Sequence, residues 1–277
     1  MILGVDYASV DDNTRPDFTA LHRWGARFAV IRAAFMYGGA SLADATWERD
    51  HAAARAAGIQ VAPFVPLDWS GAFQPLLERL LDVYPARARG DLPVALDVEG
   101  ASGLAPAHAL TKVEEAVTAL QAHGLAVMIY TSNNVWVEQL GDLPSVVCGA
   151  CPLWLKVGYP WRARNPPHPE KVPPASPVPR PWRSAGSPGA FVEQFQGDAI
   201  EVPGFTSTVD VNVFLTYKAS ASDPRTTWIR TKLEASRLSC GDSVVELDEA
   251  IRAFQSSHQL DVDGRIGPAT WAELCRA

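Results

Sequence analysis

The sequence predicts a β/α barrel followed by a small all-α domain, and three observations support this fold class. The chain has 277 residues and a mass of 29.9 kDa, nearly twice the ~150 residues of a common domain, so one large and one small unit fit it. Short apolar runs alternate with helix-like stretches over the first two hundred residues, which is typical of β/α units. A stretch without large apolar residues at 218–224 then indicates a domain boundary.

Eight apolar runs are the predicted strands, and eight strands suggest a closed barrel. They cover residues 2–6, 28–32, 60–66, 94–99, 126–130, 153–157, 191–195 and 208–214. Between them, helices are predicted at 41–57 and 73–83, and at 106–123, which opens with proline. Gly58 and Gly124 follow two of these helices, as expected of C-cap positions.

Residues 159–189 interrupt the alternation. They are rich in proline, which excludes a continuous helix, and they interleave tryptophan with arginine. We expect either an irregular surface insertion or one wall of a binding groove.

The C-terminal residues predict a helical unit with its own small core. Residues 226–238 and 244–258 have amphipathic patterns, and Gly267-Pro268 begins a short third helix. We therefore expect a barrel at 1–217, a linker at 218–225 and a three-helix domain at 226–277. About 50 residues form a marginal core, so a Cys240–Cys275 disulfide is one expectation and free thiols are the alternative. Cys148 and Cys151 are expected to be ordinary thiols or a local bridge.

Composition and charge exclude several classes of protein. The chain is 47% hydrophobic and only 20% charged, which excludes wholesale disorder. Its net charge of -7 argues against a nucleic-acid partner, which requires a clustered basic face. No apolar run reaches the ~18 to 20 residues that cross a bilayer, and no signal-like segment opens the chain. We expect no membrane partner, and release by lysis or a dedicated export route if the protein works outside the cell.

Two carboxylates on one predicted strand are the most informative feature. In Leu96-Asp97-Val98-Glu99, strand alternation directs Asp97 and Glu99 to one face and the apolar residues to the other. Such a pair is either a strand end that reaches water or part of a functional site.

Two further acids favour the functional interpretation. Asp6 ends the first predicted strand, and Asp210 shares a face with Asn212 on the last. The carboxyl ends of barrel strands meet at one rim, so we expect four acids together, one of them with a raised pKa. This combination of a proton donor with charged carboxylates suits glycosidic bond cleavage. A divalent metal is the competing interpretation, but no Asp-x-Asp-x-Asp-Gly loop is present, and we expect neither metal nor cofactor.

An ordered set of motifs in the first ~215 residues resembles glycoside hydrolase family 25, the lysozymes or N-acetylmuramidases that include phage endolysins. The motifs are Gly4-Val5-Asp6, Phe28-Ala29-Val30-Ile31-Arg32, Leu96-Asp97-Val98-Glu99, Ile129-Tyr130-Thr131-Ser132, Leu153-Trp154-Leu155, Glu193-Gln194-Phe195 and Val209-Asp210-Val211-Asn212. The resemblance implies an irregular, TIM-like β/α barrel that cleaves the β-1,4 bond between N-acetylmuramic acid and N-acetylglucosamine in peptidoglycan.

The resemblance also implies roles for individual residues. Glu99 matches the general acid and Asp97 its partner carboxylate, while Asp6 and Asp210 match the flanking acids. Substrate-binding positions are implied at Tyr130, Trp154, Gln194, Arg32 and Asn212. The chain departs from the family where Pro63-Phe64-Val65 replaces a Tyr-His-Phe-like strand end, and where Lys156-Val157-Gly158-Tyr159 replaces the usual Ala-x-Tyr.

The C-terminal segment resembles a three-helix peptidoglycan-binding domain, through Ala250-Ile251-Arg252-Ala253-Phe254-Gln255 and the run from Leu260 to Trp271. We therefore expect a monomeric muramidase that acts on bacterial peptidoglycan, with Glu99 made a proton donor by Asp97 and partial burial. Two alternatives are an inactive wall-binding protein and a hydrolase of chitin-like β-1,4 N-acetylglucosamine polymers.

Overall fold

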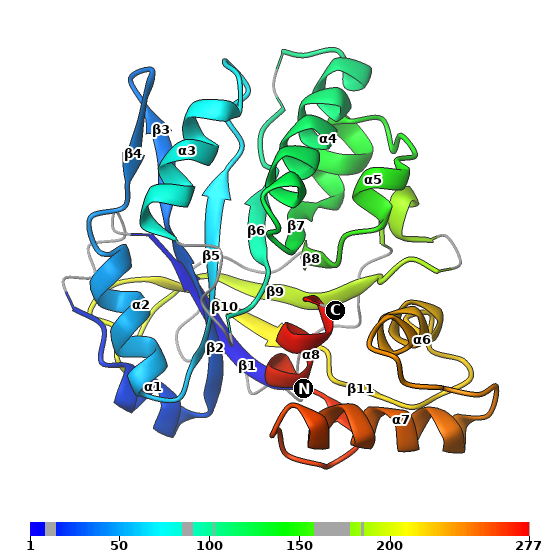
Figure 1. The fold of residues 1–277 in the computed structure, drawn as a ribbon. Coiled ribbons are helices and arrows are strands. Elements are labelled where there is room, and N and C mark those ends of the chain that lie inside the picture. The colour runs from blue at the N-terminus through cyan, green and yellow to red at the C-terminus, as the bar shows by residue number, and fades with distance from the viewer. Residues whose placement is uncertain (9–14, 85–90, 102, 158–177, 184–185, 277) are drawn as a thin grey trace.

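The computed structural model describes residues 1–8, 15–84, 91–101, 103–157, 178–183 and 186–276, and its centre is a closed eight-stranded barrel (Figure 1). The strand order around the barrel is β1-β10-β9-β8-β7-β6-β5-β2. The strands are β1 Ile2–Tyr7, β2 Ala26–Arg32, β5 Gln60–Pro66, β6 Val94–Asp97, β7 Val127–Ser132, β8 Leu153–Lys156, β9 Ala190–Ala199 and β10 Val209–Phe214. Every predicted strand is present, and the predicted α/β fold class is confirmed.

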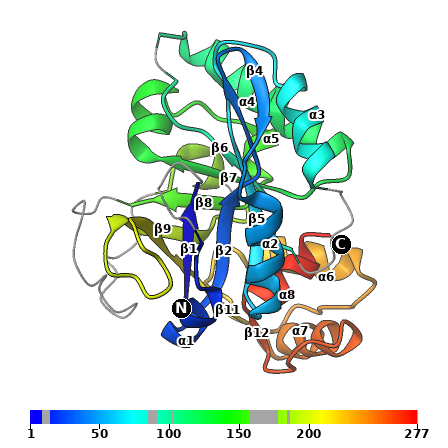
Figure 2. The same cartoon turned by 90° about the vertical axis from the view of Figure 1, so that its left-hand side faces the viewer.

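Helices pack on the outside of the parallel strands, and a β-hairpin rises beside α3 (Figures 1 and 2). The helices are α1 Phe18–Trp24, α2 Trp47–Ala56, α3 Gln74–Val83, α4 Pro106–Ala122 and α5 Val146–Gly149, with a π-helical turn at Asn134–Gln139 and a 3-10 turn at Arg180–Arg183. The hairpin joins β3 Ala34–Tyr37 to β4 Ala40–Ala43. Of the proline-rich segment, residues 159–177 lie outside the described residues.

The helix predicted at 41–57 is wrong in its first part, because residues 40–43 form β4. The side chain of Asp44 accepts hydrogen bonds from the backbone N–H and the hydroxyl of Thr46, at 3.1 Å each. Local bonds of this kind turn the chain before a helix starts. The helix therefore begins only at Trp47.

The barrel departs from a regular β/α barrel at its last strand. Neighbours from β1 through β2 and β5 to β9 are parallel, whereas β10 is antiparallel to both β9 and β1. Asp210 lies near the beginning of β10, and its register partner on β1 is Asp6. The reversed direction thus brings the start of β10 to the rim where the parallel strands end.

Strand alternation separates an interior layer from an outer one. Phe28, Val30, Met128 and Trp154 belong to a cluster inside the barrel, whereas their sequence neighbours pack under the helices. Gly4 permits this packing, because a Cβ atom there would lie 2.3 Å from the Phe28 ring.

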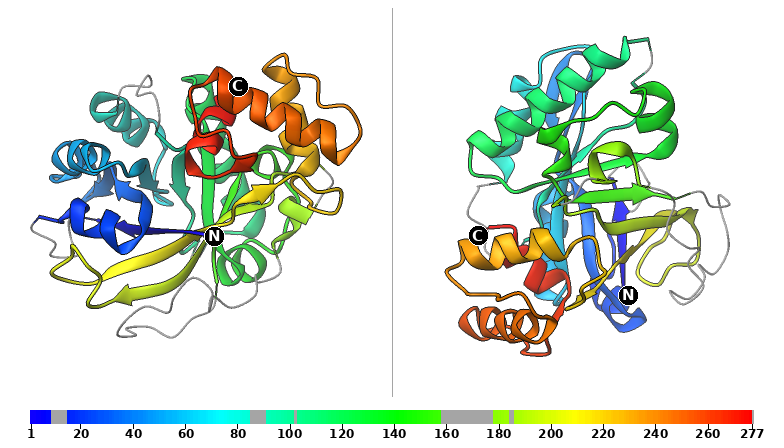
Figure 3. Two further views of the ribbon diagram at one scale, coloured as in Figure 1. Left: turned by 90° about the horizontal axis from the view of Figure 1, so that it is seen from below. Right: turned by 90° about the vertical axis from the view of Figure 1, so that its right-hand side faces the viewer.

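The C-terminal helices lie against the opposite end of the barrel from the rim, beside the N-terminus (Figures 1 and 3). They are α6 Thr226–Ala235, α7 Val244–Ser257 and α8 Pro268–Leu274, and β12 Arg265–Ile266 pairs with β11 Tyr217–Lys218. Trp271 of α8 is buried and stacks on Phe191 of β9 at 5.3 Å between ring centroids. It also contacts Phe214 of β10, again at 5.3 Å. The barrel and the helices therefore share one hydrophobic cluster.

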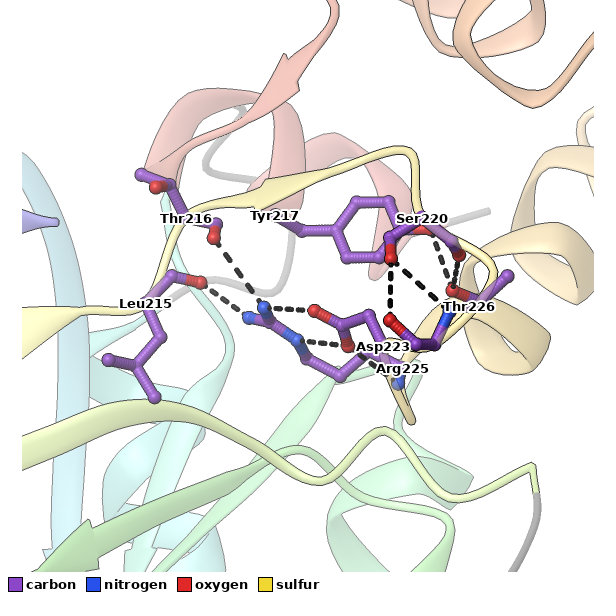
Figure 4. Close-up of polar contacts among 8 residues, drawn as sticks. Leu215, Thr216, Tyr217, Ser220, Asp223, Arg225 and Thr226 are labelled. Carbon is purple, nitrogen blue, oxygen red and sulfur yellow. Dashed lines mark hydrogen bonds and ion pairs between the residues drawn. The ribbon is translucent and has the colours of Figure 1, made fainter. Parts of the chain in front are cut away.

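Residues 218–225, the predicted linker, are tied to their neighbours by hydrogen bonds (Figure 4). The Arg225 guanidinium donates to the carbonyls of Leu215 and Thr216 and to the carboxylate of Asp223. The Thr226 hydroxyl donates to the carbonyl of Ser220 at 2.6 Å. The connection is thus folded against both units.

All four cysteines are free, so the Cys240–Cys275 disulfide is absent from the structure. Burial raises the pKa of the Cys275 thiol to about 12. No helix within the described part of the chain is long and apolar enough to span a membrane.

Candidate active site

Asp97 and Glu99 lie at the rim where β6 ends. Asp97 is partly buried, and its Oδ1 atom is shielded from solvent and has no hydrogen-bond partner among the described residues. Burial raises the pKa of Asp97 well above its usual range, the charge of Glu99 raises it further, and Lys156 opposes both effects. Asp97 is therefore the carboxyl group of this pair that burial drives toward the protonated form.

The Glu99 side chain is 47% exposed and makes an ion pair with Lys156, at 3.2 Å between Oε1 and Nζ. The Tyr130 hydroxyl lies 3.5 Å from the same Oε1, at the outer limit of a hydrogen bond. The Trp69 indole N–H donates to the Glu99 backbone carbonyl at 2.6 Å. The structure thus places the expected burial on Asp97 and leaves Glu99 accessible from solvent.

The side-chain amide of Gln194 bridges Asp6 and Asp210, and the amide of Asn212 binds Asp6. The Gln194 Nε2 group donates to Asp210 Oδ2 at 2.6 Å and to Asp6 Oδ1 at 3.2 Å. Asn212 Nδ2 also donates to Asp6 Oδ1, at 2.6 Å, and the backbone N–H of Asp198 donates to Asp210 Oδ1 at 2.7 Å. Asp6, Asp198 and Asp210 line one side of a small cavity of about 120 Å³ at the rim.

Tyr130 connects the two pairs of acids. Its hydroxyl donates to Gln194 Oε1 at 2.6 Å while facing Glu99 on its other side. A continuous set of polar contacts therefore runs from Glu99 through Tyr130 and Gln194 to Asp6 and Asp210. The four predicted acids do meet at one rim.

Two of the predicted substrate-binding residues lie beneath this network. Trp154 and Asn212 are buried, and the Trp154 indole N–H donates to Asn212 Oδ1 at 2.8 Å. Trp154 also packs on the Tyr130 ring, with centroids 4.3 Å apart. Both residues orient the polar layer above them, whereas Tyr130 and Gln194 belong to that layer.

Arg32 is held away from the acids. Its Nε donates to the buried carboxylate of Asp44 at 2.9 Å, and its guanidinium lies 4.1 Å from the centre of the Phe35 ring. These contacts join the end of β2 to the β3–β4 hairpin.

Three contacts at the site involve residues that the sequence does not mark as functional: Lys156, Trp69 and the backbone of Asp198. Strand alternation along β8 identifies Lys156, because its side chain points to the same inward side of the strand as that of Trp154. Trp69 comes from a loop, and no periodicity places a loop residue. Asp198 lies near the end of β9, beyond the strand predicted at 191–195.

The arrangement is suited to acid-base chemistry. The pKa of Asp97 is raised by burial, and Glu99, two residues further along the chain, is accessible from solvent. Proton transfer to a leaving group requires such a combination of a protonated and an accessible carboxyl group. In the described ranges, no group of three or more His, Cys, Asp or Glu side chains is arranged to hold a metal ion.

Family comparison agrees with this chemistry. Residues 5–169, more than half of the chain, match the model of Glycosyl hydrolases family 25. Residues 240–274 match the model of a peptidoglycan binding domain. No curated protein sequence matches the chain.

Solved structures share the fold at low sequence identity. A bacterial lysozyme from Streptomyces coelicolor is 19% identical with a TM-score of 0.61, over 82% of this chain and 97% of that one. A muramidase from Trichobolus zukalii is 20% identical with a TM-score of 0.59, over 82% and 98%. A family 25 glycosyl hydrolase from Bacillus anthracis is 17% identical with a TM-score of 0.58, over 77% and 88%.

Proposed function

The chain belongs to glycosyl hydrolases family 25, and from that premise we propose that it cleaves the β-1,4 bond between N-acetylmuramic acid and N-acetylglucosamine in bacterial peptidoglycan. The observation that carries this proposal is the meeting of Asp6, Asp97, Glu99 and Asp210 at the rim of the family's barrel. The structural neighbours described as lysozyme and muramidase support the choice of bond.

In the proposed mechanism, Glu99 is the general acid. Its carboxyl is exposed to solvent, so it is the member of the pair that reaches a bound glycan and protonates the glycosidic oxygen. Asp97 shares the proton of the pair, because two nearby carboxylates titrate together, and orients the N-acetyl group or a water molecule. Asp6 and Asp210 stabilise positive charge that develops at the anomeric carbon.

The remaining site residues position these acids. Tyr130 and Gln194 hold the carboxylates by hydrogen bonds, and Trp154 and Asn212 support this arrangement through their own contacts. Pro63-Phe64-Val65 and Lys156-Val157, where the chain departs from the family pattern, alter the contacts to the flanking sugars.

The C-terminal helices are proposed to hold the enzyme on its polymeric substrate, with a catalytic unit at 1–217, a connection at 218–225 and a wall-binding unit at 226–277. The match to a peptidoglycan binding domain at 240–274 supports this role. The protein would act as a monomer on the bacterial wall, reached by phage-type lysis or by dedicated export.

Mass spectrometry of digested peptidoglycan tests the proposal. The expected products carry new reducing-end N-acetylmuramic acid, and the Glu99→Gln variant releases none above background. Unchanged glycan with retained protein would identify a wall-binding protein without activity. Cleavage of chitooligosaccharides alone would move the substrate to chitin-like polymers.

A further inference from the structure

Lys156 places a positive charge beside the acid pair. It ends β8, with register partners Ser132 on β7 and Gln194 on β9. Its Nζ atom lies 3.2 Å from Glu99 Oε1, and its side chain is only 22% exposed.

The groups around this ion pair come from five strands or their ends. Asp97 ends β6 and Glu99 follows it, the Tyr130 hydroxyl comes from β7, and Gln194 of β9 contacts Asp6 of β1 and Asp210 of β10. Trp69 fixes the Glu99 backbone. Lys156 acts on both members of the pair, since it contacts Glu99 and also opposes the rise in the pKa of Asp97.

We propose that Lys156 is a positioning residue that sets the protonation of the Asp97–Glu99 pair and thereby moves the working pH range of the enzyme toward acid. This inference rests on the proposed function, in which the active form of the pair carries one proton. A neighbouring cation stabilises each carboxylate relative to its protonated form. Both protons of the pair are therefore lost at a lower pH than they would be without the cation. Both limbs of the pH-rate profile then lie at lower pH than with a neutral side chain at 156.

A purely structural ion pair makes a different prediction. A partly exposed pair contributes little to stability, so its removal would lower the melting temperature slightly without moving the pH-rate profile. The position of the two limbs therefore separates the proposed role from a structural one.

The experiment compares wild type with Lys156→Met, which has similar length without charge, and Lys156→Arg, which keeps the charge. Reducing ends released from soluble peptidoglycan fragments give kcat/KM from pH 3 to 9. We expect both limbs of Lys156→Met to shift upward by about one pH unit, and those of Lys156→Arg to stay near wild type. Lys218→Met removes an exposed charge on β11 and should leave the profile in place.

Carboxyl carbon NMR titration of the folded, substrate-free protein supplies a readout that does not depend on activity. The Asp97 resonance should titrate at higher pH in Lys156→Met than in wild type. Superimposable titrations and rate profiles in a folded Lys156→Met protein would overturn the inference. A wild type that releases no reducing ends would overturn the proposed function instead, and the NMR titration would still decide the effect of Lys156.

Discussion

At the scale of single residues, the burial that the sequence predicts for Glu99 is found mainly at its neighbour Asp97. Glu99 was expected to be partly buried, but Asp97 is the more buried member and has the raised pKa, while Glu99 is 47% exposed. Strand alternation predicts that both point to one face. It does not predict depth, because depth depends on how neighbouring strands close over each side chain.

We expect Glu99→Gln to lower the rate of wall lysis by about 10²- to 10⁴-fold, because the amide cannot donate the proton. Loss of turbidity of a cell-wall suspension measures the rate, and a thermal melt checks the fold. Glu115→Gln, at an exposed position of α4, is the matched control and should lyse like wild type. Lysis by Glu99→Gln at the wild-type rate would rule out Glu99 as the acid.

Gly4 is required by a neighbouring ring. The added Cβ of Gly4→Ala would lie 2.3 Å from the Phe28 ring, and that ring is fully buried. Such overpacking costs about 1–3 kcal/mol of stability, which urea denaturation measures. In the double variant with Phe28→Leu, the total loss should be smaller than the sum of the single losses, because the clashing atoms are gone. Strict additivity would contradict the contact.

At the scale of elements, β9 carries polar groups on both faces. Gln194 faces the site, whereas neighbouring Glu193 lies opposite Val213 and Leu155 of the outer layer. Burial raises the pKa of Glu193 to about 7, and its Oε1 has no hydrogen-bond partner among the described residues.

This glutamate predicts a pH-dependent stability. Its pKa is about 7 in the folded protein against 4.5 for a solvent-exposed glutamate, so the unfolded chain binds fewer protons between these pH values. The destabilising effect is therefore absent below pH 4.5, grows as the pH rises and is complete above pH 7. Glu193→Gln should melt higher than wild type at pH 8, with the advantage disappearing by pH 4.5. An advantage that does not change with pH would contradict the burial of an ionisable group there.

Which elements form was largely predictable, and how they pair was not. Runs of β-branched and apolar residues predict all eight barrel strands, and Pro106 with Gly124 predicts the boundaries of α4. The direction of β10 cannot be predicted from its own residues, because side chains alternate between the two faces in parallel and antiparallel strands alike. The β3–β4 hairpin was missed because its residues also fit a helix, and the contact of its strands with α3 and β5 favours the extended form.

At the scale of the whole molecule, the C-terminal helices pack against the end of the barrel opposite the acidic rim. Trp271 packs on Phe191 and Phe214, and Arg276 donates to the Asp91 carbonyl 185 positions away along the chain, at 2.6 Å. The sequence predicts a separate three-helix domain after a linker at 218–225. A shared core indicates instead that removal exposes large aromatic surfaces of the barrel.

Trp271→Ala should therefore destabilise the entire protein, by about 3–5 kcal/mol, and lower the melting temperature of the barrel together with that of the helices. Circular dichroism in the near ultraviolet and peptide-resolved hydrogen exchange follow the two parts separately. Val245→Ala, at an exposed position of α7, is the control and should be nearly neutral. Melting of the helices with the barrel unaffected would show that the two parts are independent.

The sequence by itself determined the fold class, the eight strands and the four acids, because strand periodicity and the common rim of a barrel are local and topological rules. Only the tertiary structure decided that β10 runs antiparallel, that Asp97 is the more buried acid while Glu99 is exposed beside Lys156, and that the helices share the core of the barrel. These features depend on contacts between residues distant in the chain. Burial, charge and stacking at such contacts are properties of the packed molecule, and no stretch of sequence contains them alone.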